Sequence, residues 1–262
     1  MEFLLHILAG ASVGFMIGLT GVGGGSLMTP LLLMFGYPAQ IAIGTDLLYA
    51  ALTKANGAWS QHQRGNVRWK IVLLLAAGSI PTSLALHFFV LELGNETADN
   101  YEQLLTRSLG LMLVITGLIL VFKEKLRFGA INEKPRLVMN FLHCHSNRIT
   151  FLMGIVLGIC VTLSSVGAGA FCAAVLLTLY SKTPASQIIA TDIAHAVPLT
   201  LIAGLGYLAA GQVDLTLLTA LLVGSLPAIH LGGRISNAIP EKILQLLLTG
   251  VLLSLGVYYL IP

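Results

Sequence analysis

Long apolar stretches, separated by short polar segments, run through the whole chain. Eight of them have about the length that a helix needs to cross the hydrocarbon of a bilayer, roughly 20 residues. They cover residues 3–22, 41–62, 69–91, 104–122, 149–165, 187–208, 214–232 and 243–261. The pattern predicts an all-α membrane protein with about eight transmembrane helices.

Two shorter apolar pieces, at 27–35 and 170–180, are long enough for only half a crossing at about 1.5 Å per residue. Each follows a glycine-rich segment, Thr-Gly-Val-Gly-Gly-Gly-Ser at 20–26 and Ser-Ser-Val-Gly-Ala-Gly at 164–169. Glycine lets the backbone leave helical angles, and irregular backbone in a bilayer must be buried in protein or line a wet cavity. We therefore expect a broken or re-entrant half-helix in each half of the chain.

The two halves resemble each other at a nearly constant spacing. Gly14, Gly23 and Gly25 precede Gly158, Gly167 and Gly169 by 144 residues, and the spacing is 146 residues for the later matches. These later matches pair Pro38, Thr45, Asp46, Gly78, Ser79 and Pro81 with Pro184, Thr191, Asp192, Gly224, Ser225 and Pro227. We infer two pseudo-symmetric repeats, at 1–122 and 149–262, joined by a polar linker at 123–148.

Composition and charge support an integral membrane protein and predict its orientation. The chain is 56% hydrophobic and 10% charged, whereas soluble domains have about 25% charged residues. The basic linker and the 63–70 loop are expected to be cytoplasmic, and the acidic 92–103 loop external. The second half has the opposite bias, which hints at inverted repeats, but these few charges leave parallel and inverted arrangements both open. We interpret residues 3–22 as a retained span, because no basic segment or cleavage site accompanies it.

The glycine-rich segments are candidates for anion binding, because free backbone N–H groups at a helix start favour an anion. Alternatively, these glycines only allow close helix crossing. Intramembrane Asp46 and Asp192 are functional candidates, although the Thr-Asp sequence also suits an N-cap. Lys54 either extends to the interface or adds positive charge to an anion pathway, and His195 follows Asp192 by three residues. The candidate substrate-binding residues are Thr20, Gly23, Gly24, Gly25, Ser26, Thr45, Asp46, Lys54, Ser164, Ser165, Gly167, Gly169, Thr191, Asp192 and His195.

We find no catalytic signature, and we expect neither an enzyme nor a bound cofactor or metal. The His-Cys-His run at 143–145 has no second cluster with which to complete a four-ligand zinc site. Nothing in the charge pattern points to nucleic acid.

The first glycine-rich segment and the residues after it resemble the opening of the sulfite exporter TauE/SafE family of bacterial membrane proteins. The matching residues are Gly14, Gly18, Gly21, Gly23, Gly24, Gly25, Ser26, Pro30, Pro38, Ala42, Gly44, Thr45 and Asp46. The segments at 166–169 and 190–192 resemble the family's degenerate second copy, in which Ala174 stands at the position equivalent to Pro30.

The resemblance implies a secondary transporter of a small sulfur-containing anion, such as sulfite or sulfoacetate, as a multi-pass protein of the bacterial inner membrane. Its partners would be the anion and the lipid bilayer, and a coupled proton and an oligomer are left open. Two alternatives are a passive anion channel and, less favoured, an intramembrane redox or enzyme subunit.

Overall fold

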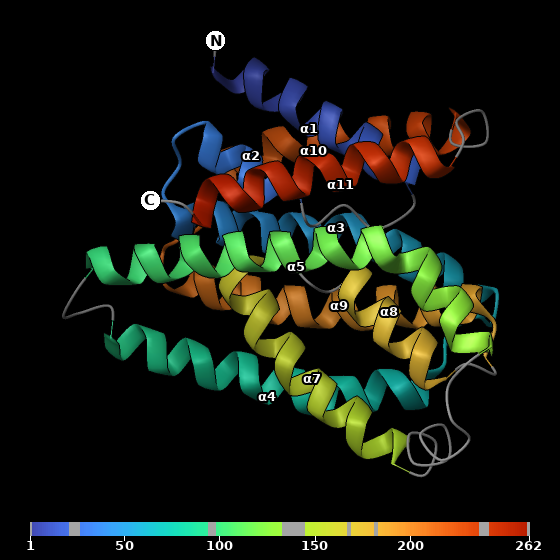
Figure 1. Ribbon diagram of the computed structural model, residues 1–262. Helices are drawn as coiled ribbons and strands as arrows, with labels where there is room; N and C mark the ends of the chain where they lie inside the picture. Colours follow the sequence, from blue (N-terminus) through green and yellow to red (C-terminus); the bar gives the residue numbers. More distant parts are fainter. Residues whose placement is uncertain are drawn as a thin grey trace.

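The computed structural model describes residues 2–20, 27–93, 98–132, 145–166, 169–180, 183–235 and 241–260. These residues form ten α-helices, and no strand occurs among them (Figure 1). The helices are α1 (Glu2–Thr20), α2 (Met28–Met34), α3 (Ala39–Gln63), α4 (Trp69–Leu93), α5 (Ala98–Asn132), α7 (Ser146–Ser164), α8 (Ala170–Leu179), α9 (Ala185–Ala209), α10 (Leu215–Ile235) and α11 (Glu241–Leu260). The described part of the chain is all-helical, as the apolar pattern predicted.

The eight long helices coincide with the eight predicted spans, and the short helices α2 and α8 lie where half-helices were expected. Five helices, α4, α5, α7, α9 and α10, are long and apolar enough to cross a membrane by length and composition. Helix α3 contains Asp46, Lys54 and three glutamines, and α1 and α11 contain shorter apolar stretches. Eight crossings therefore remain a prediction. Helix α5 continues ten residues past the predicted end of its span, into the segment interpreted as a linker.

Helices α3 and α9 begin and end alike. Each starts directly after a proline, Pro38 or Pro184, whose φ is −54° and which needs no N–H at that position. Each is followed by a glycine in the left-handed conformation, Gly65 with φ of 68° or Gly211 with φ of 71°. The N–H groups of these glycines and of the next residues donate to carbonyls of the last helical turn, which is a Schellman motif. These shared ends determine where the loops after α3 and α9 turn back.

Helix α1 lies in direct backbone contact with α10. A Cβ atom added to Gly10 would lie 2.3 Å from the Leu221 carbonyl oxygen, and one added to Gly18 would lie 2.3 Å from that of Ile229. Residue numbers rise together along the two helices, which therefore run parallel. The four-residue spacing of Gly10, Gly14 and Gly18 is the small-residue pattern that allows such close crossing in membranes.

Helices α7 and α4 make the corresponding contact. A Cβ atom on Gly154 would lie 2.3 Å from the Leu75 carbonyl oxygen, and one on Gly158 would lie 2.6 Å from that of Ser79. Each of these four residues stands 144 or 146 positions from its counterpart in the contact of α1 with α10. The contact is therefore reciprocal. Helix α1, the first of the first half, packs on α10 of the second half, and α7, the first of the second half, packs on α4 of the first half.

The central pair of helices, α3 and α9, is antiparallel. A Cβ atom on Gly204 would lie 2.7 Å from a methyl carbon of Leu48, and one on Gly57 would lie 3.9 Å from Ile193. Residue numbers thus rise along one helix as they fall along the other.

The outer pair, α5 and α11, is antiparallel in the same way. Gly110 contacts the end of α11 near Leu260, and Gly117 contacts Leu253. Figure 1 shows these two helices side by side on the near face of the bundle.

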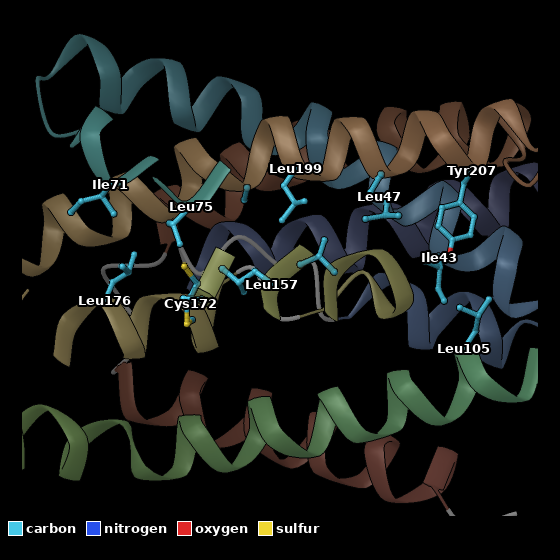
Figure 2. Packing of buried hydrophobic residues seen from close by; sticks show 14 of the residues in the cluster. Ile43, Leu47, Ile71, Leu75, Leu105, Leu157, Cys172, Leu176, Leu199 and Tyr207 are labelled. Carbon is cyan, nitrogen blue, oxygen red and sulfur yellow. The ribbon is translucent and has the colours of Figure 1, made fainter. Parts of the chain in front are cut away.

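The two largest apolar clusters among the described residues both include part of the central pair. One combines α4, α7, α8 and α9 with residues of α3 and α5, and Leu75, Leu157, Cys172 and Leu199 meet within it (Figure 2). The other combines α1, α2 and α3 with α10. Each core thus takes in a helix from the other half, so the two halves are interlocked.

We expect Gly224→Ala to lower the thermal stability of the protein. The added methyl group would lie 2.0 Å from the Ile7 carbonyl oxygen, and overpacking of this kind costs about 1–3 kcal/mol. Thermal unfolding in detergent should give a lower midpoint for this variant and for Gly78→Ala, its counterpart. Gly250→Ala is the matched control, because a Cβ atom there meets nothing within 4 Å. Equal midpoints for the three variants would contradict the close contact.

Candidate functional site

Asp46 and Asp192 lie inside helices, not at their starts. Each stands seven residues after the first residue of its helix, Ala39 of α3 or Ala185 of α9. Both residues are buried, with 0% and 4% of their surface exposed. The N-cap alternative is therefore wrong, because an N-cap precedes the first helical turn. A buried carboxylate in a membrane helix is a candidate for function.

One oxygen of the Asp46 carboxylate is held by the short helix α2. The backbone N–H and the hydroxyl of Thr29 both donate to Asp46 Oδ2, at 3.2 Å and 2.5 Å. Ser165, where α7 ends, faces the same carboxylate and has φ of 56°, a left-handed conformation that is uncommon for serine. Among the described residues, neither Asp46 Oδ1 nor Ser165 Oγ has a hydrogen-bond partner. We call the residues around each aspartate a half-site. The half-site of Asp46 thus includes Ser165, a residue from the second half.

Asp192 has the equivalent arrangement with the short helix α8. The thiol of Cys172, which is completely buried, contacts the Asp192 carboxyl group. Asp192 Oδ1 makes no hydrogen bond within the described part of the chain. Cys172 therefore occupies the place that Thr29 has in the first half, with a weaker donor.

One turn beyond each carboxylate stands a second buried polar side chain. On α9 this is His195, whose Nε2 lies 2.9 Å from the hydroxyl oxygen of Ser79 on α4. On α3 it is Tyr49, whose hydroxyl faces Ser225 on α10. His195 Nδ1 and the Tyr49 hydroxyl are both buried without a hydrogen-bond partner among the described residues. Tyr49, Ser79 and Ser225 were not among the predicted site residues. The signal that could have found them is the spacing of 146 residues, which relates Tyr49 to His195 and Ser79 to Ser225.

Lys54 lies close to the middle of the α3–α9 pair. The two contacts between these helices given above have their midpoint near Thr53 of α3 and Leu199 of α9. Lys54 is half-buried, and its charge acts on both Asp46 and Asp192. Along the helix pair, Lys54 therefore lies between the two aspartates.

The two carboxylates are not brought together into one cluster. Asp46 and Asp192 each lie six or seven residues from the midpoint of the pair, in opposite directions, which corresponds to about 10 Å along a helix axis. The residues predicted for a single site thus divide into two equivalent half-sites on either side of Lys54. The counterpart of Lys54 in the second half, Thr200, is buried and donates to the Ala196 carbonyl oxygen at 2.8 Å, so the positive charge has no second copy.

Three other candidate hydroxyls take part in structural hydrogen bonds. Thr45 accepts from the backbone N–H of Asp214 at 3.3 Å, and Thr191 accepts from that of Arg68 at 3.0 Å. Ser164 donates to the carbonyl oxygen of Cys160 in its own helix at 2.6 Å. These hydroxyls fasten helices and loops and are not free to bind a ligand in this conformation.

The remaining candidates are described only in part. Gly23, Gly24, Gly25, Ser26 and Gly167 lie outside the described residues, as does the side chain of Thr20. Gly169 precedes α8 with φ of −142° and ψ of −89°. Among the described residues, no three His, Cys, Asp or Glu side chains converge as a metal site would require, and two residues of the 143–145 run lie outside that part of the chain.

Apolar side chains face outward around this polar centre. Leu8, Phe88 and Leu246 expose 62%, 72% and 76% of their surface, while both aspartates are buried. A bilayer favours this arrangement, because polar groups must be satisfied within the protein and apolar side chains can face lipid. Together with the five candidate spans, it defines a multi-pass membrane protein with a polar interior.

Comparison with known proteins agrees with this class. Residues 6–259 match the family model described as sulfite exporter TauE/SafE. The chain is 35% identical to the Bacillus subtilis "Probable membrane transporter protein YjnA" over 95% of its own length and 96% of that protein. It is 24% identical to the Methanocaldococcus jannaschii "Probable membrane transporter protein MJ0441" over 99% and 97% of the two chains. No solved structure matches it. The chain therefore belongs to the sulfite exporter TauE/SafE family of membrane transporters.

We expect Thr29→Val to destabilise the protein, because the valine cannot donate to the buried Asp46 carboxylate. Losing a buried hydrogen bond to a charged group costs about 1.5–3 kcal/mol. The thermal unfolding midpoint in detergent should therefore fall. Thr178→Val in α8 is the matched control, since the Thr178 hydroxyl bonds only within its own helix, to the Ala174 carbonyl oxygen at 3.0 Å. If both variants unfold at the wild-type midpoint, the Thr29–Asp46 contact does not hold α2 in place.

Proposed function

We propose that this protein is a secondary transporter that moves a small sulfur-containing anion, such as sulfite, sulfoacetate or a related sulfonate, across the bacterial inner membrane. The family and the names of its relatives support transport as the activity. The observation that carries the proposed site is the set of buried polar atoms without partners on α3, α9 and the end of α7. Unpaired buried polar groups are rare, and they are retained where a ligand completes them.

We also propose that the two halves are inverted copies of one unit. The reciprocal contacts of α1 with α10 and of α7 with α4 support a two-fold relation between the halves. Two helices that such an axis exchanges, and that lie antiparallel, require an axis in the plane of the membrane. The pairs α3–α9 and α5–α11 both have this geometry. An inverted pair of halves offers a transporter two similar conformations, open to opposite sides.

The distribution of charge agrees with inverted halves. The loop after α3 carries Arg64 and Arg68, and the Arg68 N–H reaches Thr191 near the start of α9. At the other end of the pair, the loop after α9 has Asp214 as its one charged residue, and this N–H reaches Thr45 near the start of α3. The positive-inside tendency makes the arginine end cytoplasmic. Helices α3 and α9 would then cross the bilayer in opposite directions.

The anion would bind near Lys54, where the central pair has its fixed positive charge. Hydrogen-bond donors would come from Tyr49, His195 and Ser165, together with backbone N–H groups of the glycine-rich segments around Gly24 and Gly167. Oxyanions carry several strong acceptors, so a site with several donors and one cation suits them. Asp46 and Asp192 flank this position on the two sides.

We expect Lys54→Met to abolish anion binding. The experiment is a thermal-shift screen of the purified protein with sulfite, sulfate, thiosulfate, sulfoacetate, taurine, acetate and chloride. A ligand that binds only the folded state raises the midpoint of unfolding. At a ligand concentration a hundred times the dissociation constant, it adds about 2.7 kcal/mol to the free energy of unfolding. Lys70→Met, at an exposed position, should keep the shift. A sulfur oxyanion that stabilises Lys54→Met as much as the wild type would show that this site is misplaced.

We expect Gly24→Leu to lose the same ligand-dependent shift while the protein stays folded and inserted in the membrane. The bulky side chain would obstruct a backbone that must approach the ligand closely. Size-exclusion chromatography would check folding, and saturable counterflow in proteoliposomes would separate a transporter from a passive channel. Normal anion binding by Gly24→Leu would mean that the glycines serve packing only.

A further inference from the structure

We propose that Asp46 and Asp192 are the two proton sites of a proton–anion symporter, and that an anion binds beside Lys54 only together with a proton. This inference rests on the proposed function and adds its coupling ion. It is carried by the placement of two carboxylates and one ammonium group along the central helix pair.

The charges of these three groups do not favour an anion when all are ionised. Within the described part of the chain, the α3–α9 pair holds the buried carboxylates Asp46 and Asp192 and, between them along the pair, the half-buried Lys54. Their sum is then −1, and charges interact strongly where little water is present. A proton on either carboxylate makes the centre neutral, and a second proton makes it positive. The centre therefore accepts an anion most favourably after it has taken up a proton.

Each carboxyl group has one oxygen available to carry that proton. Asp46 Oδ2 is occupied by two hydrogen bonds from Thr29, whereas Oδ1 of Asp46 and Oδ1 of Asp192 are buried and unpartnered among the described residues. The Ser165 hydroxyl, which also lacks a partner and faces Asp46, can accept from a protonated Oδ1. For Asp192, an oxygen of the bound anion would accept the hydrogen bond from the protonated carboxyl group.

Neighbouring ionisable groups do not supply the missing positive charge. Within the described ranges, the group beside Asp46 is the hydroxyl of Tyr49, and a phenol is neutral near pH 7. Beside Asp192 they are His195 and the Cys172 thiol. A positive charge on His195 would be repelled by Lys54, and Ser79 already bonds to one of its ring nitrogens. Protonation of the carboxylates is therefore the way to change the charge of the centre.

The positions of the carboxylates provide a route for the proton. Asp46 lies in the half of α3 near the Asp214 loop, at the end proposed as external, and Asp192 lies in the half of α9 near Arg68, at the end proposed as cytoplasmic. Lys54 stands between them. A proton and an anion that enter from one side would thus meet one aspartate first, then Lys54, and then the other aspartate before they leave on the opposite side.

This coupling has a measurable consequence in binding. If one proton accompanies each anion, the anion and the proton strengthen each other's binding by the same factor. The dissociation constant of the anion should then rise about tenfold per pH unit, as proton linkage requires. Methanesulfonate is a suitable probe, because it stays ionised throughout this range and any pH effect must come from the protein.

The experiment uses the full chain in proteoliposomes with a pH-sensitive dye in the lumen. An inward gradient of methanesulfonate should acidify the lumen with the wild type and with Lys70→Met. Asp46→Asn, Asp192→Asn and the double variant imitate the protonated carboxyl groups. Size-exclusion chromatography and the thermal unfolding midpoint check that these variants are folded. The double variant should lose the acidification, and its dissociation constant for methanesulfonate should no longer change with pH.

The possible results separate the two proposals. Acidification that persists in the double variant would overturn the coupling proposed here, as would wild-type transport of methanesulfonate without protons; both would leave anion transport intact. Loss of anion binding in the asparagine variants would also overturn it, because a neutral side chain should suffice. A wild-type protein that neither binds nor exchanges methanesulfonate would contradict the proposed function itself.

Discussion

Close backbone contact between helices of different halves is the constraint on which the rest of this structure depends. Hydrocarbon provides no hydrophobic force between helices, so they associate through tight packing and internal hydrogen bonds. Glycines on α1 and α7 bring these helices against the carbonyl groups of α10 and α4. Each half therefore has its third long helix, α4 or α10, in the core of the other, and neither half forms a separate body.

This exchange determines where the polar centre lies. With α4 and α10 committed to opposite cores, α3 and α9 remain as the antiparallel pair between them, and the carboxylates of that pair are buried on two sides of one midpoint. The short helices α2 and α8 then reach these carboxylates through Thr29 and Cys172. Both cores therefore depend on helices from both halves.

Differences between the two half-sites are as informative as their likeness. The contact of Thr29 with Asp46 is made in the second half by Cys172 with Asp192. By the spacing of 146 residues, Tyr49 is replaced by His195 and Lys54 by Thr200. Both halves have the carboxylate and the serine that faces the next turn, while the lysine occurs once. In the transporter proposed above, this single cation would serve one anion that is exposed to either side in turn, whereas two cations would favour two anions.

The sequence alone determined the class, the helices and the list of polar candidates, because apolar length and glycine breaks are local properties that a bilayer reads directly. It also predicted the short helices at 27–35 and 170–180, and it paired Asp46 with Asp192 by their spacing. It was wrong to offer Thr45-Asp46 as a helix start, because Pro38 begins the helix two turns earlier. Only the tertiary structure decided that the central helices run antiparallel, that α4 and α10 exchange partners, and that the two aspartates lie on opposite sides of Lys54. The physical reason is that these relations depend on contacts between segments that lie far apart in the sequence. The local pattern of apolar and polar residues does not specify which helix packs against which.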